Sequence, residues 1–181
     1  MSFINVKEAY NNRIKDIKQA TGVDNTMALP RIAKVSINVG LGQDRQNKDM
    51  VTYIADSLTQ ITGQKAVPTH AKQSIAGFKI RENDVVGYRV TLRGERMNDF
   101  INRLLNIALP RIREFRGIDP RKFDRQGNIT IGLKDQIPFA ELGNDAIDKQ
   151  FGLTITITIS NSDPRKSEEL LKTLGFPMKT E

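Results

Sequence analysis

The clearest pattern in the chain is an alternation of apolar and polar side chains, which recurs in four stretches. Such a two-residue period is typical of β-strands with one face on a core and the other face exposed. The four predicted strands are residues 32–39, 85–93, 128–133 and 153–160. A shorter strand is expected near residues 65–71, because Pro68 is excluded from a helix interior and biases Val67 towards an extended conformation.

Apolar side chains spaced three and four residues apart predict four helices. These helices are expected at residues 1–20, 48–62, 99–109 and 164–174. Gly63 and Gly175 are expected to end two of them as left-handed C-caps. Pro110 is expected to stop the third helix, and Asp163 followed by Pro164 has the composition of an N-cap and first helical position for the last.

The strand faces decide the expected fold. A sheet buried on both sides would contain continuous apolar runs, so the alternating strands predict a sheet that is open on one side. The expected class is α+β: a two-layer sandwich with a mostly antiparallel sheet, helices packed on one face and the other face open. Residues 1–181 are expected to form a single domain, since this length can bury a substantial core.

The predicted open face is polar and carries no carboxylate. Its eleven positions are Lys34, Ser36, Asn38, Arg89, Thr91, Arg93, Asn128, Thr130, Thr154, Thr156 and Thr158. The formal net charge is +7, and residues 63–125 hold 14 Lys and Arg against 7 acids, which indicates an anionic partner. A solvated sheet face remains the alternative, because Thr is common in strands for its β propensity alone.

The chemistry of this face favours structured RNA as the partner. It has no aromatic side chain on which single-stranded bases could stack. Lys, Arg, Asn and Thr are suited to phosphate oxygens, 2′-hydroxyls and the edges of shallow grooves. No carboxylate lies between Ser57 and Arg81, a stretch that also contains Lys65, Lys72 and Lys79.

Enzymatic alternatives find little support. The chain has one His and no Cys, so few pairs of nucleophile and base are available, and no spacing of acids and His is typical of a metal site. No catalytic residue, metal, cofactor or membrane segment is expected. One alternative remains open: Gly40-Leu-Gly42 follows a strand and precedes a helix, as in a dinucleotide-binding turn, although Arg45 occupies the place of the third glycine.

Residues Leu58–Ser74 closely resemble the signature of a ribosomal protein family, the universal large-subunit protein number five of bacterial type. Further stretches that look like landmarks of this family cover nearly the whole chain. They are Pro30–Gly40, Val86–Arg93, Arg111–Asp124 and Gly152–Ser160.

The resemblance implies a non-enzymatic structural protein in the central protuberance of the large subunit of a cytoplasmic ribosome. Its implied partners are 5S rRNA, 23S rRNA, P-site tRNA, a protein of the small-subunit head and neighbouring large-subunit proteins.

Carried onto this chain, the resemblance implies three sets of site residues. The implied 5S rRNA positions are Lys34, Asn38, Gln64, Lys65, Arg89, Thr91 and Arg93. The implied tRNA positions are Lys72, Gln73, Ser74, Gly77, Phe78, Lys79 and Arg81, in a loop that Gly77 would keep pliant. The implied bridge to the small subunit uses Arg111, Arg113, Arg116 and Arg121. For the tRNA loop an alternative stays open, in which Phe78 folds back and the loop merely closes the sheet.

Overall fold

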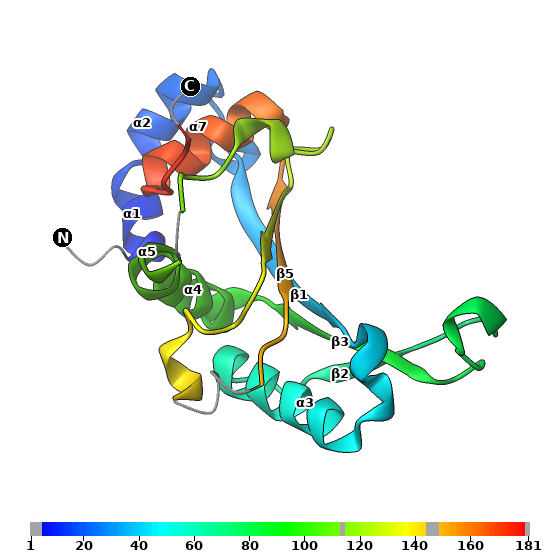
Figure 1. Ribbon diagram of the computed structural model, residues 1–181. Coiled ribbons are helices and arrows are strands. Elements are labelled where there is room, and N and C mark those ends of the chain that lie inside the picture. Colours follow the sequence, from blue (N-terminus) through cyan, green and yellow to red (C-terminus); the bar gives the residue numbers. More distant parts are fainter. Residues whose placement is uncertain (1–4, 113–114, 144–148, 180–181) are drawn as a thin grey trace. The chain divides into compact units, whose positions relative to one another are not determined.

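The computed structural model describes residues 5–112, 115–143 and 149–179, apart from the side chain of Gln43. Its sheet has five antiparallel strands in the order β2-β3-β1-β5-β4 (Figure 1). The strands are β1 (Arg31–Gly40), β2 (Val67–His70), β3 (Val85–Leu92), β4 (Ile129–Leu133) and β5 (Leu153–Ser160). The α+β class and the open antiparallel sheet predicted from the alternation are confirmed.

The chain divides into two compact units. Unit 1 comprises Met1–Val35, Leu92–Ile131 and Thr156–Glu181, and unit 2 comprises Ser36–Thr91 and Gly132–Ile155. Strands β1, β3, β4 and β5 each contribute residues to both units. The single-domain assignment for residues 1–181 stays a prediction.

The alternation of the strands is reproduced in their burial, with one exception. In β5 the apolar residues from Leu153 to Ile159 are buried and the intervening Thr residues are half-buried. In β3 the order is reversed at one point, where Gly87 is buried and Tyr88 is only half-buried. The reason is a close backbone approach, since a Cβ at residue 87 would lie 2.5 Å from the Val39 carbonyl oxygen.

Unit 1 contains most of the helices. They are α1 (Val6–Asn12), α2 (Ile14–Thr21), α4 (Gly94–Arg103), a π-helical turn (Leu104–Ala108), α5 (Leu109–Arg111) and α7 (Pro164–Leu174). Helix α2 packs against α7, and α1 packs against α4 and α7. Ile17, Phe100, Leu104 and Leu170 are among the side chains that this packing buries almost completely.

The prediction of one helix over residues 1–20 is wrong, because the helix breaks at Arg13. Arg13 leaves the helical region with φ −107° and ψ 18°, and its guanidinium donates a hydrogen bond to the Thr173 carbonyl at the end of α7. The start of α1 is also held from a distance, since the Val6 N–H donates to the Asn102 side-chain oxygen at 2.9 Å. Both interactions join residues far apart in sequence, so local periodicity could not reveal them.

The prediction that Pro110 stops the third helix is also wrong. Helix α4 begins at Gly94, and helical structure continues through the π-helical turn into α5, with Pro110 in the first turn of α5. The helical structure ends at Arg111, one residue beyond Pro110. The exposed Glu95 and Arg96 explain the late predicted start, since the apolar period begins only after them.

The predicted helix ends at the glycines are confirmed. In unit 2, α3 (Lys48–Thr62) ends at Gly63 with φ 67°, and in unit 1 α7 ends at Gly175 with φ 90°. The Asp163 side chain caps α7 by accepting a hydrogen bond from the Lys166 N–H at 2.9 Å. These helix ends are fixed by residues that are neighbours in sequence, so they can be predicted directly from the sequence.

Replacing Gly127 by Ala is expected to lower the free energy of unfolding by about 1–2 kcal/mol, the usual cost of a left-handed residue with a side chain. Gly127 has φ 78°, and a Cβ there would meet the buried Ser167 hydroxyl and lie 2.8 Å from the Asp163 carbonyl oxygen. Gly132→Ala is the matched control, because a Cβ at Gly132 has no neighbour within 4 Å. Equal urea midpoints for the two variants would contradict this account.

Candidate nucleic-acid interface

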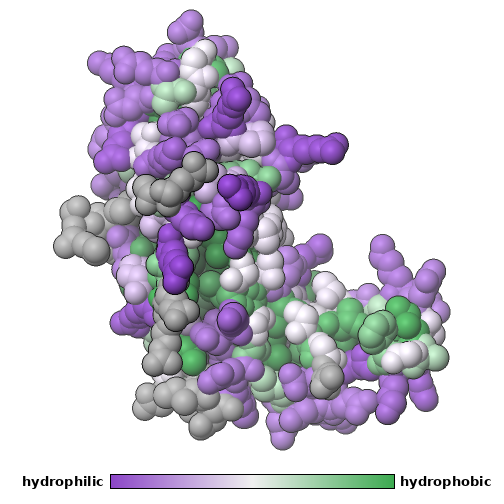
Figure 2. Space-filling view, turned by 45° about the horizontal axis from the view of Figure 1, so that its top comes forward, coloured by the Kyte–Doolittle hydropathy of each residue, from purple (hydrophilic) through white to green (hydrophobic). Residues whose placement is uncertain are grey.

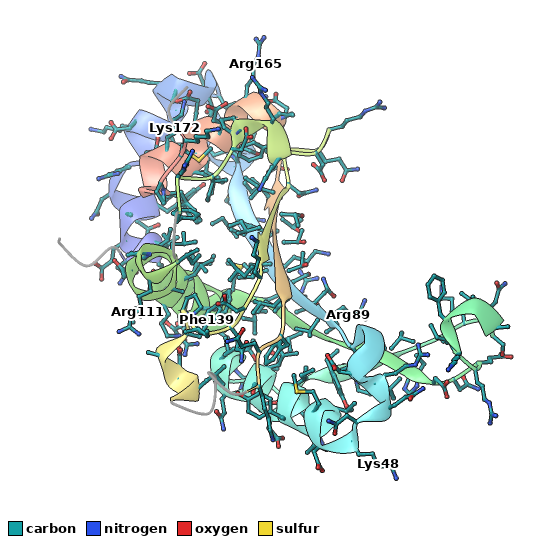
Figure 3. All side chains as sticks on the ribbon, in the orientation of Figure 1. Lys48, Arg89, Arg111, Phe139, Arg165 and Lys172 are labelled. Atoms are coloured by element: carbon teal, nitrogen blue, oxygen red, sulfur yellow. The ribbon has the colours of Figure 1, made fainter. Side chains whose placement is uncertain are left out.

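Unit 2 brings together five of the seven residues predicted to bind 5S rRNA. They are Asn38, Gln64, Lys65, Arg89 and Thr91. Asn38, Lys65 and Arg89 are exposed, and Gln64 and Thr91 are half-buried. Arg89 projects from β3 on the side away from α3 (Figure 3). The burial pattern therefore places Asn38, Arg89 and Thr91 on the polar strand face of this unit.

The turn after α3 fixes Gln64 against this face. The Thr62 hydroxyl donates to the Leu58 carbonyl at 2.6 Å, with the Gln64 carbonyl oxygen also within 3.0 Å, and it accepts from the Gln64 N–H at 3.3 Å. The Gln64 side-chain nitrogen in turn donates to the Thr91 carbonyl at 3.3 Å. Among the residues that the structure describes, the Gln64 side-chain oxygen has no hydrogen-bond donor, so it remains available to a ligand.

Unit 1 holds the other two predicted residues, Lys34 and Arg93. Within the described ranges neither has a carboxylate partner, so both charges are available to an anion. Not every polar strand residue of this unit is available. The hydroxyls of Thr130 and Thr156 form a hydrogen bond with each other at 3.1 Å, so the proton of one of them is already used.

Asn128 is a structural residue rather than part of a binding surface. Its side-chain nitrogen donates to the Asp124 carboxylate at 2.8 Å, and its side-chain oxygen accepts from the Ile159 N–H at 3.1 Å. Partial burial raises the pKa of Asp124, but hydrogen bonds from Asn128 and the following turn outweigh it and the pKa falls below its ordinary value. The ionised Asp124 thus holds the start of β4.

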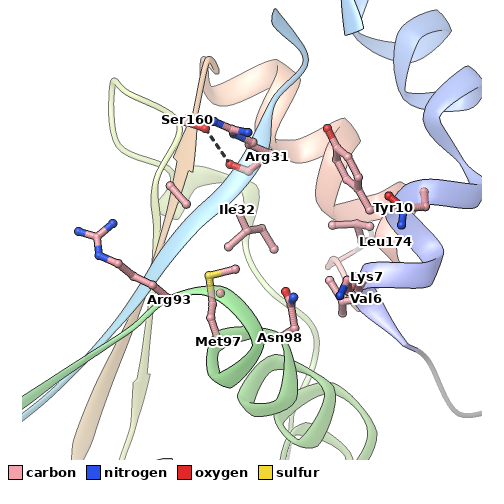
Figure 4. A pocket seen from close by; sticks show the side chains of 13 residues that line it. Val6, Lys7, Tyr10, Arg31, Ile32, Arg93, Met97, Asn98, Ser160 and Leu174 are labelled. Carbon is pink, nitrogen blue, oxygen red and sulfur yellow. Dashed lines mark hydrogen bonds between the residues drawn. The ribbon is translucent and has the colours of Figure 1, made fainter. Parts of the chain in front are cut away.

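A cavity of about 480 Å³ lies in unit 1 between α1, the start of β1 and the start of α4. Its lining is mixed: Ile32, Met97 and Leu174 are grouped together, whereas the guanidinium of Arg93 points away from them (Figure 4). The cavity therefore does not gather its basic lining residues around one point.

The predicted tRNA loop is an ordered hairpin, here called the arm (residues 71–84), in unit 2. Its base is closed by hydrogen bonds between the backbones of Ala71, Asn83 and Asp84. Ile75 and Ile80 form an antiparallel bridge, and residues 76–78 form a single 3-10 turn between them. Lys79 and Asn83 adopt left-handed conformations, with φ 52° and φ 69°, whereas Gly77 does not. That Gly77 keeps the loop pliant stays a prediction.

The tip of the arm exposes apolar side chains beside basic ones. Phe78 is 69% exposed and Ile75 is 47% exposed, which excludes the alternative in which Phe78 folds back. Lys72, Lys79 and Arg81 are exposed around them. Figure 2 shows the arm at the right of the view as a green apolar cluster bordered by purple polar side chains. An exposed apolar cluster of this kind marks an interaction surface.

The predicted bridge residues lie on the stretch Arg111–Arg121 of unit 1, which begins with the last residue of α5 and ends in a 3-10 turn. Arg111, Arg116 and Arg121 are exposed, and Arg113 lies outside the described residues. The stretch is anchored by Ile118, which is buried and pairs with Met178. The Asp119 side chain accepts from the Arg121 N–H at 2.9 Å and so starts the short 3-10 turn Pro120–Lys122. The backbone that carries Arg121 is therefore held in place.

Within the described ranges, no helix has both the length and the apolar character needed to cross a membrane. The same residues contain no group of three or more side chains suited to a metal ion.

Comparison with known proteins decides the family. The model of the ribosomal protein L5 family matches residues 25–81, and the model of the C-terminus of the same family matches residues 85–178. The chain is 47% identical over 175 residues to the large ribosomal subunit protein uL5 of Psychrobacter sp. (strain PRwf-1), covering 96% of this chain and 98% of that protein. The uL5 protein of Desulfotalea psychrophila has the same identity and coverage. For that of Francisella philomiragia the identity is 44% over 176 residues, covering 97% of this chain and 98% of the relative.

The chain belongs to the ribosomal protein L5 family. As a member of this family it is a structural component of the large ribosomal subunit, part of a ribonucleoprotein that serves translation, and not an enzyme. The predicted family and the predicted location in the ribosome are confirmed.

The dinucleotide alternative at Gly40–Gly42 is thereby excluded, and the geometry agrees. A dinucleotide-binding turn joins a parallel strand to a helix whose first N–H groups face the phosphates. Here the sheet is antiparallel, and the Asn47 side chain accepts from the Asp49 and Met50 N–H groups at the start of α3. The N–H groups that a phosphate would need are already used.

One residue with a clear contact in this ribosomal protein was missed from the sequence. Arg45 follows Gly42 in a 3-10 turn (Gly42–Gln46), and its guanidinium donates hydrogen bonds to carbonyls at the tip of the arm. The contact joins residues 33 and 34 positions apart, so no local pattern signals it. The only sequence signal was an Arg where a phosphate-binding turn would have a glycine.

Proposed function

We propose that this ribosomal protein binds 5S rRNA through the polar strand residues and helps to attach it to the large subunit beside 23S rRNA. The observation that carries the proposal is the Gln64 amide held against the Thr91 carbonyl, in the same unit as the exposed Asn38 and Arg89. Hydrogen-bonding groups held on a rigid backbone are suited to a structured RNA, whose grooves present phosphates and 2′-hydroxyls. Lys34, Lys65, Arg89 and Arg93 would add phosphate contacts.

The proposal includes two further contacts. The arm would meet P-site tRNA, with Lys72, Lys79 and Arg81 on phosphates and with Ile75 and Phe78 against ribose or base surface. Supporting this contact, the tip is both apolar and basic and is exposed. The exposed Arg111, Arg116 and Arg121 would face a protein of the small-subunit head. Binding of purified 5S rRNA, with tRNA as a control over a series of salt concentrations, tests the first contact directly.

Removing a phosphate contact is expected to change the salt dependence of 5S rRNA binding. Arg93→Gln and Lys34→Gln should each reduce the slope of log K against log salt by about one unit or less. Asn38→Ala and Thr91→Ala should weaken binding but leave the slope nearly unchanged, because neither side chain displaces a counterion. Filter binding at several salt concentrations measures both quantities. A similar change of slope in all four variants would show that the division into phosphate and hydrogen-bonding contacts is wrong.

A further inference from the structure

The Arg45 guanidinium joins two segments of unit 2 that are far apart in sequence. Its Nη2 atom donates a hydrogen bond to the Phe78 carbonyl and another, of 2.9 Å, to the Lys79 carbonyl. Arg45 itself is half-buried and belongs to the 3-10 turn that links β1 to α3. A guanidinium can hold two acceptors at once because its N–H groups are fixed in one plane.

Arg45 contacts the arm at Lys79, whose backbone conformation is unfavourable and needs support. Lys79 adopts a left-handed conformation, with φ 52°, which is unfavourable for a residue with a side chain. Within the arm, the turn is held by backbone hydrogen bonds from the Phe78 N–H to the Ile75 carbonyl and from the Lys79 N–H to the Ala76 carbonyl, and by the pairing of Ile75 with Ile80. Hydrogen bonds from a charged donor are stronger than neutral ones, so Arg45 adds the main contact from outside the arm.

The surroundings of Arg45 are basic rather than acidic. A groove of about 600 Å³ is lined by Arg45, Lys48, Lys79 and Arg81, and Asp84 is the single carboxylate in its lining. The Asp84 carboxylate accepts from the Arg81 N–H at 2.8 Å, and in the described part of the chain it forms no ion pair with Arg45. Arg45 therefore meets backbone carbonyls in a field of like charge, which would be unfavourable without those two hydrogen bonds.

We propose that Arg45 is a positioning residue, which holds the tip of the arm in the orientation that presents Ile75 and Phe78 to tRNA. The inference rests on the proposed tRNA contact of the arm. Its physical basis is a population effect: the apparent dissociation constant equals the intrinsic constant divided by the fraction of molecules in the competent conformation. When Arg45 is removed, the tip keeps its own residues and charges but samples other conformations.

The first test measures the arm without tRNA. In the full-length protein, Arg45→Ala is expected to speed amide hydrogen exchange at Lys79 and Ile80, whose N–H groups close the turn. Lys48→Ala is the matched control, because it removes the same charge from the same groove and has no hydrogen bond to the arm. Unchanged exchange in Arg45→Ala, or equal acceleration in both variants, would show that Arg45 does not hold the tip of the arm.

The second test measures P-site tRNA affinity on ribosomes carrying each variant. Arg45→Ala is expected to weaken tRNA binding roughly 3- to 10-fold. This is the range for an arm whose competent conformation is populated only about a third to a tenth of the time. Arg45→Lys should recover only part of the loss, since an ammonium does not reproduce the planar fork. Lys48→Ala should stay close to wild type, and 5S rRNA affinity should be unchanged in all three variants.

A ribosome in which residues 73–80 are replaced by a linker distinguishes the proposed tRNA contact of the arm from the proposed positioning role of Arg45. If this replacement weakens tRNA but Arg45→Ala does not, the arm binds tRNA and the positioning role is wrong. If the replacement leaves tRNA affinity unchanged, the proposed tRNA contact fails. In that case faster exchange in Arg45→Ala alone would still show that Arg45 holds the arm, but the holding would not serve tRNA.

Discussion

Ribosomes in which residues Gln73–Ile80 are replaced by a short Gly-Ser linker are expected to assemble and keep 5S rRNA, yet to hold P-site tRNA less tightly. The arm closes at its base through backbone bonds of Ala71 with Asn83 and Asp84, which the replacement leaves in place. Ile75 and Phe78 are exposed, so their loss removes no buried core. Thermal stability and 5S rRNA affinity of the isolated protein should therefore stay close to wild type.

The tRNA deficit relative to wild type is expected at every salt concentration but to be largest at low salt. The replacement removes Lys79, and losing a phosphate contact makes the affinity fall less steeply with salt, whereas the loss of the apolar contacts does not depend on salt. Toe-printing or filter binding of P-site tRNA over a salt series measures the deficit. The full-length variant Phe78→Ala with Ile75→Ala is the matched control, since it keeps every charge and the arm length. If the linker variant fails to bind 5S rRNA while remaining folded, the arm belongs to the rRNA site and the tRNA assignment should be dropped.

The part of the fold that could be predicted depends on local chemistry. The Thr and Ile residues of β5 alternate because one face is buried, and Gly63, Asp163 and Gly175 act within a single helical turn. Each of these features is visible in a window of a few residues. The polar strand face of the candidate site follows from the same alternation, so its residues could be named before their positions were known.

The part that could not be predicted depends on contacts between distant residues. The break at Arg13 is supported by the Thr173 carbonyl, and the start of α1 by Asn102, so no neighbouring residue signals either one. Gly87 is buried because the backbone of β1 passes close to it. The ordered conformation of the arm also depends on a contact between distant residues, the hydrogen bonds from Arg45 to its tip. Sequence periodicity describes what a residue does within its own element, and these residues act between elements.

The largest loss of 5S rRNA affinity is expected from the polar residues held beside the end of α3. Asn38→Ala, Gln64→Ala and Thr91→Ala should each weaken binding by about 1–3 kcal/mol, the cost of leaving a desolvated polar partner unpaired. That cost corresponds to about 5- to 150-fold in the dissociation constant. Gln64→Ala should have the largest effect, because its amide is already fixed by the Thr91 carbonyl and loses little freedom when RNA binds.

Thr52→Ala provides the matched control for these three variants. Thr52 is an exposed residue of α3 whose hydroxyl donates to the Lys48 carbonyl at 3.0 Å, so the change removes a similar group from outside the polar strand face. Circular dichroism should show all four variants folded, and isothermal titration with purified 5S rRNA gives the affinities. The three strand-face variants should lose affinity and Thr52→Ala should not. Wild-type affinity in folded Asn38→Ala, Gln64→Ala and Thr91→Ala would place the 5S rRNA site elsewhere on the protein, with the arm and the Arg111–Arg121 stretch as the remaining basic surfaces.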